Sequence, residues 1–150
     1  MLPKSLVILL ACLVAGIPAS RADDSRQSGL LRAVATADSS EVHPDNVFEV
    51  IVSLQNPANT VQRIKIPEAA WDRVWKSSNR HVTWDFWESD DDKDVTIEIP
   101  PGQSYTFPKP LRMFVDSSVR KSRFTFRMGF KTVAFGKTLW SDPITLDVTP

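Results

Sequence analysis

The chain has 150 residues, in which 18 lysines and arginines balance 18 aspartates and glutamates. A formal net charge of zero gives no overall attraction to nucleic acid or to an anionic membrane, so no nucleic-acid partner is expected. The single cysteine, Cys12, lies in a segment that we expect to be removed. Disulfides, thiol catalysis and thiolate metal sites are therefore not expected in the mature protein.

Residues 1–22 have the pattern of a secretory signal peptide. Lys4 supplies a positive charge, residues 6–17 form an apolar run, and Ser-Arg-Ala at 20–22 has the small residues of a signal-peptide cleavage site. The apolar run is shorter than the roughly 18 residues of a membrane-spanning helix. We expect cleavage before Asp23 and export to the periplasm or the extracellular space.

An alternative use of the same segment remains open. The run Leu9-Leu10-Ala11-Cys12 is similar to a bacterial lipobox, in which the cysteine becomes a lipidated N-terminus. A membrane association is expected only in that case. With the signal removed, residues 23–150 have 16 basic and 18 acidic residues and a net charge of −2. Residues 23–29 are expected to form a short polar leader and residues 30–150 one domain.

Most of this domain alternates apolar and polar residues with a period of two, which is typical of β-strands with one buried face. The clearest alternation runs from 123 to 131, where Phe124, Phe126, Met128 and Phe130 share one face. Further strands are predicted, in chain order, at 30–36, 47–54, 61–66, 81–87, 95–99, 105–107, 111–115 and 144–148.

The alternation stops between Pro67 and Lys76. Proline suits the first turn of a helix, and Trp71, Val74 and Trp75 share one helical face. We predict a short helical crossover near 67–76 that closes one end of the core. The predicted fold is all-β, an antiparallel immunoglobulin-like β-sandwich of seven or eight strands.

Three features resemble bacterial exported immunoglobulin-like modules. They are Asn56-Pro57 at the end of a strand, tryptophans in the middle of the chain, and the unit I-E-I-P-P-G-Q-S-Y at 97–105. The order of the elements is also loosely similar to that of the intracellular proteinase-inhibitor family, a small all-β group. The signal peptide departs from that family's location, so no inhibitory residue is assigned.

The sequence gives little support for catalysis or for a metal site. It has no G-x-S-x-G motif, and its two histidines, His43 and His81, have no recognisable catalytic context. Oxygen donors for calcium occur at Asp90, Asp91, Asp92 and Asp94, without the spacing of a calcium loop. We expect no enzyme activity, no cofactor and no metal.

The domain is rich in tryptophan, with five residues against one tyrosine. Trp84 alternates with apolar residues and is expected in the core, while Trp71 and Trp75 are expected either to plug one end of the sandwich or to join a binding surface. Trp87, on the face opposite Trp84, is the best candidate for a surface role. Such tryptophans could stack on sugar rings or anchor a protein partner.

Charge is segregated along the chain. Residues 85–98 contain seven acids and one lysine, whereas residues 112–137 contain seven bases and one aspartate. Arg123, Arg127 and Lys131 fall on the polar face of one predicted strand and form either a basic binding stripe or an ordinary solvated face. An acidic protein, an anionic polysaccharide or self-association could use this asymmetry.

These features predict an exported, non-enzymatic binding or structural domain that contacts a protein through one sheet face or its end loops. The alternative is a carbohydrate-binding module that uses Trp87 with Trp71 or Trp75. A proteinase-inhibitor-like module is a third and weaker hypothesis.

Overall fold

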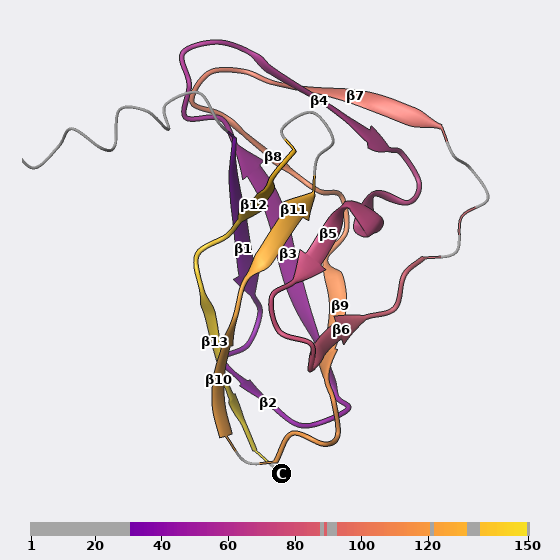
Figure 1. Cartoon of the computed structure of the whole chain (residues 1–150), viewed down its shortest axis with the longest axis vertical. Coiled ribbons are helices and arrows are strands. Elements are labelled where there is room, and N and C mark those ends of the chain that lie inside the picture. Colours follow the sequence, from indigo (N-terminus) through magenta and orange to yellow (C-terminus); the bar gives the residue numbers. More distant parts are fainter. Residues whose placement is uncertain (1–30, 88, 90–92, 121, 132–135, 150) are drawn as a thin grey trace, which may run out of the picture.

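A computed structural model of the chain describes residues 31–87, 89, 93–120, 122–131 and 136–149 (Figure 1). The predicted signal peptide at 1–22, with Cys12, and the leader at 23–29 lie outside the described residues. The described part is all-β, with a single turn of 3-10 helix. None of its helical structure is long and apolar enough to cross a membrane.

Thirteen strands are present among the described residues, more than the seven or eight predicted for the sandwich and the nine segments named as strands. The predicted strand at 123–131 is divided in two, and three short strands, at 41–42, 75–77 and 138–140, were not predicted. The thirteen strands are β1 (Arg32–Ala37), β2 (Glu41–Val42), β3 (Val47–Gln55), β4 (Gln62–Pro67), β5 (Trp75–Ser77), β6 (Val82–Trp84), β7 (Asp94–Ile99), β8 (Ser104–Thr106), β9 (Leu111–Val115), β10 (Ser122–Phe126), β11 (Met128–Lys131), β12 (Thr138–Trp140) and β13 (Ile144–Val148).

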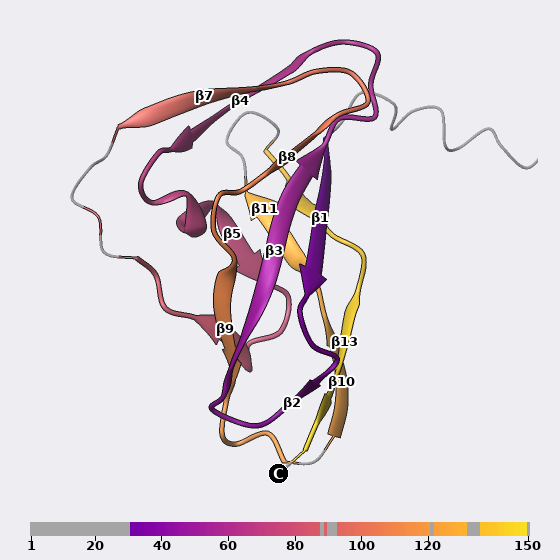
Figure 2. The same cartoon turned by 180° about the vertical axis from the view of Figure 1, so that it is seen from behind.

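The strands form four sheets. The largest has the order β1-β3-β9-β6, with β8 also paired to β3. Two three-stranded sheets have the orders β10-β13-β2 and β12-β11-β5, and β4 pairs with β7 in a ribbon. All pairings are antiparallel except the short one between β13 and β2. In Figures 1 and 2 the largest sheet and the two three-stranded sheets enclose the core, and the ribbon extends across one end.

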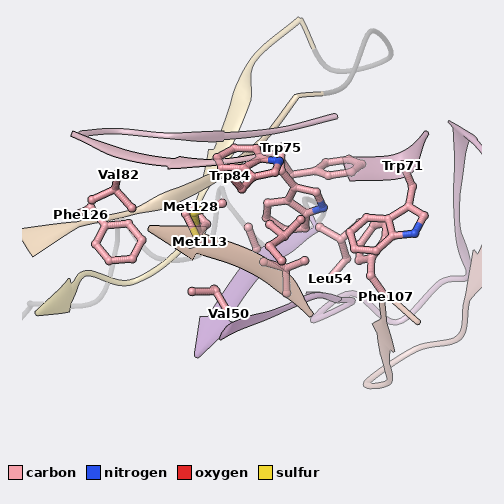
Figure 3. Packing of buried hydrophobic residues seen from close by; sticks show 14 of the residues in the cluster. Val50, Leu54, Trp71, Trp75, Val82, Trp84, Phe107, Met113, Phe126 and Met128 are labelled. Carbon is pink, nitrogen blue, oxygen red and sulfur yellow. The ribbon is translucent and has the colours of Figure 1, made fainter. Parts of the chain in front are cut away.

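The core follows the predicted alternation closely in the longer strands. Phe48, Val50, Val52 and Leu54 on β3 are all buried, and the residues between them are exposed or partly exposed. The same pattern is confirmed in β4, β7, β9 and β13. Figure 3 shows Phe126 at one end of the buried cluster and Trp71 at the other. A period of two therefore sorts side chains between core and solvent over most of the domain.

The predicted strand at 123–131 is divided at Arg127. Residues 122–126 pair with β13, whereas residues 128–131 pair with β5 and β12. At the break, the Arg127 backbone N–H donates to Ser78 Oγ at 2.8 Å and the Met128 N–H donates to Ser141 Oγ at 3.0 Å. Where the chain changes from one partner strand to another, these two serine hydroxyls accept the backbone hydrogen bonds that a neighbouring strand would otherwise accept. Every second residue still faces the core on both sides of the break.

The predicted helical crossover is shorter than expected. Only Trp71–Val74 is helical, as a 3-10 turn, and Trp75 begins strand β5. Asp72 at this turn is fully buried, and its Oδ2 accepts a hydrogen bond from the Trp87 backbone N–H at 3.0 Å.

Two further predictions need correction. The strand predicted at 81–87 ends at Trp84, so Phe86 is 55% exposed instead of facing inward. The short strands β2 and β12 lie outside every predicted strand. Strands of two or three residues are too short to show a period, and neighbouring strands fix them instead.

The Asn56-Pro57 turn is confirmed and has a structural reason. Asn56 is fully buried, and its Nδ2 donates to the carbonyls of Thr60 and Ile99 at 2.8 Å each. Its Oδ1 accepts from the Ala58 N–H at 3.0 Å. This side chain ties the end of β3 to β7 and the connecting loop, because a buried amide must have its hydrogen bonds satisfied.

Candidate functional site

Two of the predicted binding tryptophans are core residues. Trp71 is 4% exposed and Trp75 is 1% exposed. The Trp75 ring packs edge-on against the rings of Phe107 and Phe130, with centroids 5.5 and 5.3 Å apart. The prediction that either residue stacks on a ligand is therefore wrong, because the short crossover turns both rings into the apolar interior.

Trp87 also packs against the core, although it is only partly buried. Its ring meets that of Trp71 edge-on at 4.9 Å between centroids, and the Lys109 Nζ lies 5.7 Å from the ring centroid. The strand on which it was placed ends three residues earlier, so the proposed face opposite Trp84 does not exist. The hydrogen bond to Asp72 and the ring contact with Trp71 fix the position of Trp87, which packs against the buried core.

The predicted basic stripe is divided between two sheets. Arg123 lies on β10, where its Nε is 3.3 Å from Asp147 Oδ1 on the neighbouring strand. Asp147 in turn lies beside Glu41 of β2, so the local charge there is mixed. Arg127, which directly precedes β11, and Lys131, its last residue, are exposed. Arg123 is paired with an acid, so Arg127 and Lys131 are the members of the stripe that have no ion pair among the described residues.

The surface tryptophan is Trp140, which was not among the predicted site residues. It is 39% exposed at the end of β12. In the register of the sheet, Trp140 lies opposite Gly129, and Gly129 lies opposite Lys76 on the other side. Trp140, Gly129 and Lys76 therefore form one row across three strands.

Gly129 allows the indole to lie across the middle strand. A Cβ atom at this position would be 2.7 Å from Cε3 and Cζ3 of Trp140 and 2.6 Å from Cγ2 of Thr138. Such distances are sterically forbidden, so the ring occupies the space that any other side chain would fill. A glycine inside a strand often marks such a close approach, and an aromatic residue on the next strand can cover it.

One lysine lies against this ring, and a second lies on the same side of the sheet, two residues along β11 from Gly129. The Lys76 Nζ lies 5.0 Å from the centroid of the Trp140 ring, within the range of a cation–π contact. Lys131 lies opposite Thr138 at one end of β11. Strands β5, β11 and β12 contain no aspartate or glutamate. We call the outward surface formed by Lys76, Gly129, Lys131, Thr138 and Trp140 the Trp140 face.

A signal for this site was present in the sequence. Gly129 falls on the outward side of the most strongly alternating strand, where a side chain is expected, and Thr138-Leu139-Trp140 follows as a short alternating segment. Pairing the two segments would have placed the tryptophan over the glycine. The register between them, however, depends on a turn that the local pattern does not specify.

In the described part of the chain, no three histidine, cysteine, aspartate or glutamate side chains come close enough together to hold a metal ion. His43 Nδ1 lies 2.9 Å from the Thr149 carbonyl oxygen, and His81 Nε2 accepts a hydrogen bond from Arg80 at 3.3 Å. Asp94 pairs with Lys65 at 3.1 Å. The other predicted calcium donors, at 90–92, lie outside the described residues.

Comparison with known proteins gives no family for this chain: no protein-family model matches it, and no curated protein matches it. The candidate site therefore rests on the geometry of the Trp140 face.

Proposed function

We propose that the protein is an exported, non-enzymatic binding domain that holds its ligand on the Trp140 face. We also propose that its all-β architecture is an immunoglobulin-like sandwich, a class in which sheet faces and end loops commonly serve recognition. Two features support this architecture. The pairing is antiparallel except between β13 and β2, and the largest sheet lies behind β11 and β12 in Figure 1 and in front of β11 in Figure 2. Export is proposed from the signal pattern at residues 1–22.

The observation that carries the proposal is the position of Trp140. Its ring lies across Gly129 on an open sheet face and has few side-chain torsions, so little conformational entropy is lost when a ligand packs on it. Tryptophan is strongly enriched among residues that dominate binding energy. The other four tryptophans are buried in or packed against the core, which leaves Trp140 as the ring available to a ligand among the described residues.

A footprinting experiment that does not require the ligand to be identified beforehand tests the proposal. The purified protein is exposed to hydroxyl radicals with and without envelope and extracellular material from the producing organism. We expect protection of Trp140, with Trp87 and Phe86 unchanged as internal controls. We also expect Trp140→Ala to abolish retention of the protein on that material, while Phe86→Ala leaves retention intact. Unchanged oxidation of Trp140 under conditions of full retention would refute the assignment.

A second candidate is a protein partner on the outer face of the largest sheet. Val47 and Ile51 on β3 are 50% and 53% exposed and point to the same side of the sheet. Phe114, opposite Val47 on β9, is partly exposed on this side. Protection of Val47 and Ile51 instead of Trp140 in the same footprint would support this second candidate.

A further inference from the structure

We infer that the ligand of the Trp140 face is an acidic polysaccharide, with one sugar ring stacked on Trp140 and its carboxylate or sulfate groups bound by Lys76 and Lys131. This inference rests on the proposed function, because it names the ligand class of the same face.

The first argument is the charge around the ring. In the described part of the chain, carboxylate pairs are formed by other basic residues, namely Arg32, Arg63, Lys65, Lys93 and Arg123. Among the described residues neither Lys76 nor Lys131 has such a pair, and the strands that carry them, β5 and β11, contain no acid. An anionic ligand would find these two ammonium groups available, without an internal carboxylate to displace.

The second argument is the spacing of the cations along β11. Arg127 and Lys131 lie two residues before and two residues after Gly129, which corresponds to roughly 6.8 Å on each side of the row that holds Trp140. Lys137 precedes Thr138 and is exposed at the same end as Lys131. Cations therefore flank the aromatic ring along the strand direction, an arrangement that suits a chain with repeated negative charges better than a single small anion.

The third argument distinguishes a glycan from a protein. The buried centre of a protein interface is predominantly apolar and gathers several hydrophobic side chains. The other large exposed hydrophobic residues of the described structure, Val47, Ile51, Val61 and Phe86, lie outside β5, β11 and β12, the strands that form the Trp140 face. A single aromatic ring among lysines, threonine and glycine matches a sugar, which offers an apolar ring face to the indole and polar groups around its edge.

Lys76 belongs both to the surroundings of the Trp140 ring and to the cations that would bind the anionic group of the ligand. Its ammonium group lies against the Trp140 ring at 5.0 Å from the centroid. An exposed cation–π contact is weak, whereas a lysine bound to a carboxylate or sulfate forms a stronger charge-assisted hydrogen bond. Lys76 would therefore move from the ring to the anionic group of the ligand and leave the indole free for the sugar.

Isothermal titration of the purified protein tests the inference. The probes are polygalacturonate, dextran sulfate, neutral dextran and an oligothymidylate, each at low and moderate salt. We expect binding to one or both acidic polysaccharides, no binding to dextran, and affinity that falls as salt rises. Carboxylate and sulfate ligands are distinguished by whether polygalacturonate or dextran sulfate binds more tightly.

Variants locate the binding. Trp140→Ala should weaken it by about tenfold or more, and Trp140→Phe should retain part of it, since a hot-spot ring supplies at least about 1.4 kcal/mol, which is tenfold in affinity. Lys76→Met and Lys131→Met should each weaken binding several-fold and reduce its salt dependence. Lys109→Met is the matched control, because Lys109 makes the same kind of contact with Trp87 away from this face. Thermal melts confirm that each variant is folded.

The outcomes separate the inference from the proposed function. Equal binding of neutral dextran, tighter binding of oligothymidylate, or no binding of either acidic polysaccharide would overturn the acidic-glycan assignment, while a footprint on Trp140 would still support the binding face. Equal losses in Lys109→Met and Lys76→Met would reduce the effect to general charge attraction and overturn the inference. Binding unaffected by Trp140→Ala would place the polysaccharide elsewhere and refute it as well.

Discussion

The tryptophans of the core and the surface residue Trp140 behave in opposite ways, although Trp75 and Trp140 belong to the same three-stranded sheet. Trp71 meets Trp87 edge-to-face, and Trp71 and Trp75 both contact Phe107, so all three rings pack in or against the core. Trp140 instead lies on the outside of a sheet, over a glycine and beside Lys76. Residue type is the same in both regions. Pairing register decides whether a tryptophan is buried in the core or exposed on a sheet face.

The comparison also shows why the interior cluster cannot easily take part in binding. Moving Trp75 outward would leave a cavity bounded by Phe107 and Phe130. Exposing more of Trp140 costs little, since its contacts are with the surface of one strand. Variants that exchange these roles test the distinction.

The largest expected effect comes from truncating the interior ring. Trp75→Ala should lower the free energy of unfolding by about 3–5 kcal/mol, because it empties a fully buried site. Trp140→Ala should cost less than about 1 kcal/mol, as expected for a surface position. Urea denaturation of both variants measures the difference. Equal losses would show that Trp140 is as structural as Trp75.

The next effect concerns the glycine under the ring. Gly129→Ala should destabilise the domain by roughly 1–3 kcal/mol, because the new methyl group would collide with Trp140 and Thr138. The same change in a Trp140→Ala background should cost clearly less, which a double-mutant cycle measures. Additive losses would mean that the indole does not lie over this residue.

A smaller effect is expected where Asp72 holds Trp87. Asp72→Ala removes the acceptor for the Trp87 N–H and should cost roughly 1–3 kcal/mol, with the emission of Trp87 shifting to the red as the ring loosens. Asp72→Asn keeps an oxygen acceptor and serves as the matched control. Retained blue emission in Asp72→Ala would show that ring packing alone positions Trp87.

The smallest effect lies outside both tryptophan regions, at the turn after β9. Hydrogen bonds from the Ser118 hydroxyl and backbone N–H hold the pKa of Asp116 below its usual range. The stabilisation from this carboxylate is therefore present above the ordinary aspartate pKa and is lost as pH falls through the lowered value. An NMR titration of Asp116 should show this lowered pKa and a higher one in Ser118→Ala. An unchanged titration in that variant would contradict the hydrogen-bond assignment.

Local patterns predicted the long strands and most of the core, because a period of two fixes which side of a strand is buried. They placed Phe48, Val52, Met113 and Leu146 inward, where the structure has them. They failed where pairing between distant segments decides the outcome. The break at Arg127, the end of β6 at Trp84 and the pairing of β12 with β11 all depend on which strand lies alongside.

Predicting the candidate site would also have required the pairing between strands that are distant in the sequence. Composition correctly indicated an excess of tryptophan, and charge segregation indicated a basic surface, with Arg127 and Lys131 exposed as expected. The sequence alone predicts the surface role for Trp87, because the alternation of residues 81–87 runs as far as this residue, whereas the strand ends at Trp84. Trp140 acquires its position from Gly129 and Lys76, which are 11 and 64 residues away along the chain.

The most direct test of the central claim is acrylamide quenching of tryptophan emission in the wild-type protein and in Trp140→Phe. The structure predicts one readily quenched component in the wild type, from the 39% exposed Trp140, and its loss in the variant. The remaining emission should be blue and poorly quenched, as expected of rings packed in or against the core. An equally quenchable component in Trp140→Phe would place the exposed tryptophan elsewhere and contradict the account.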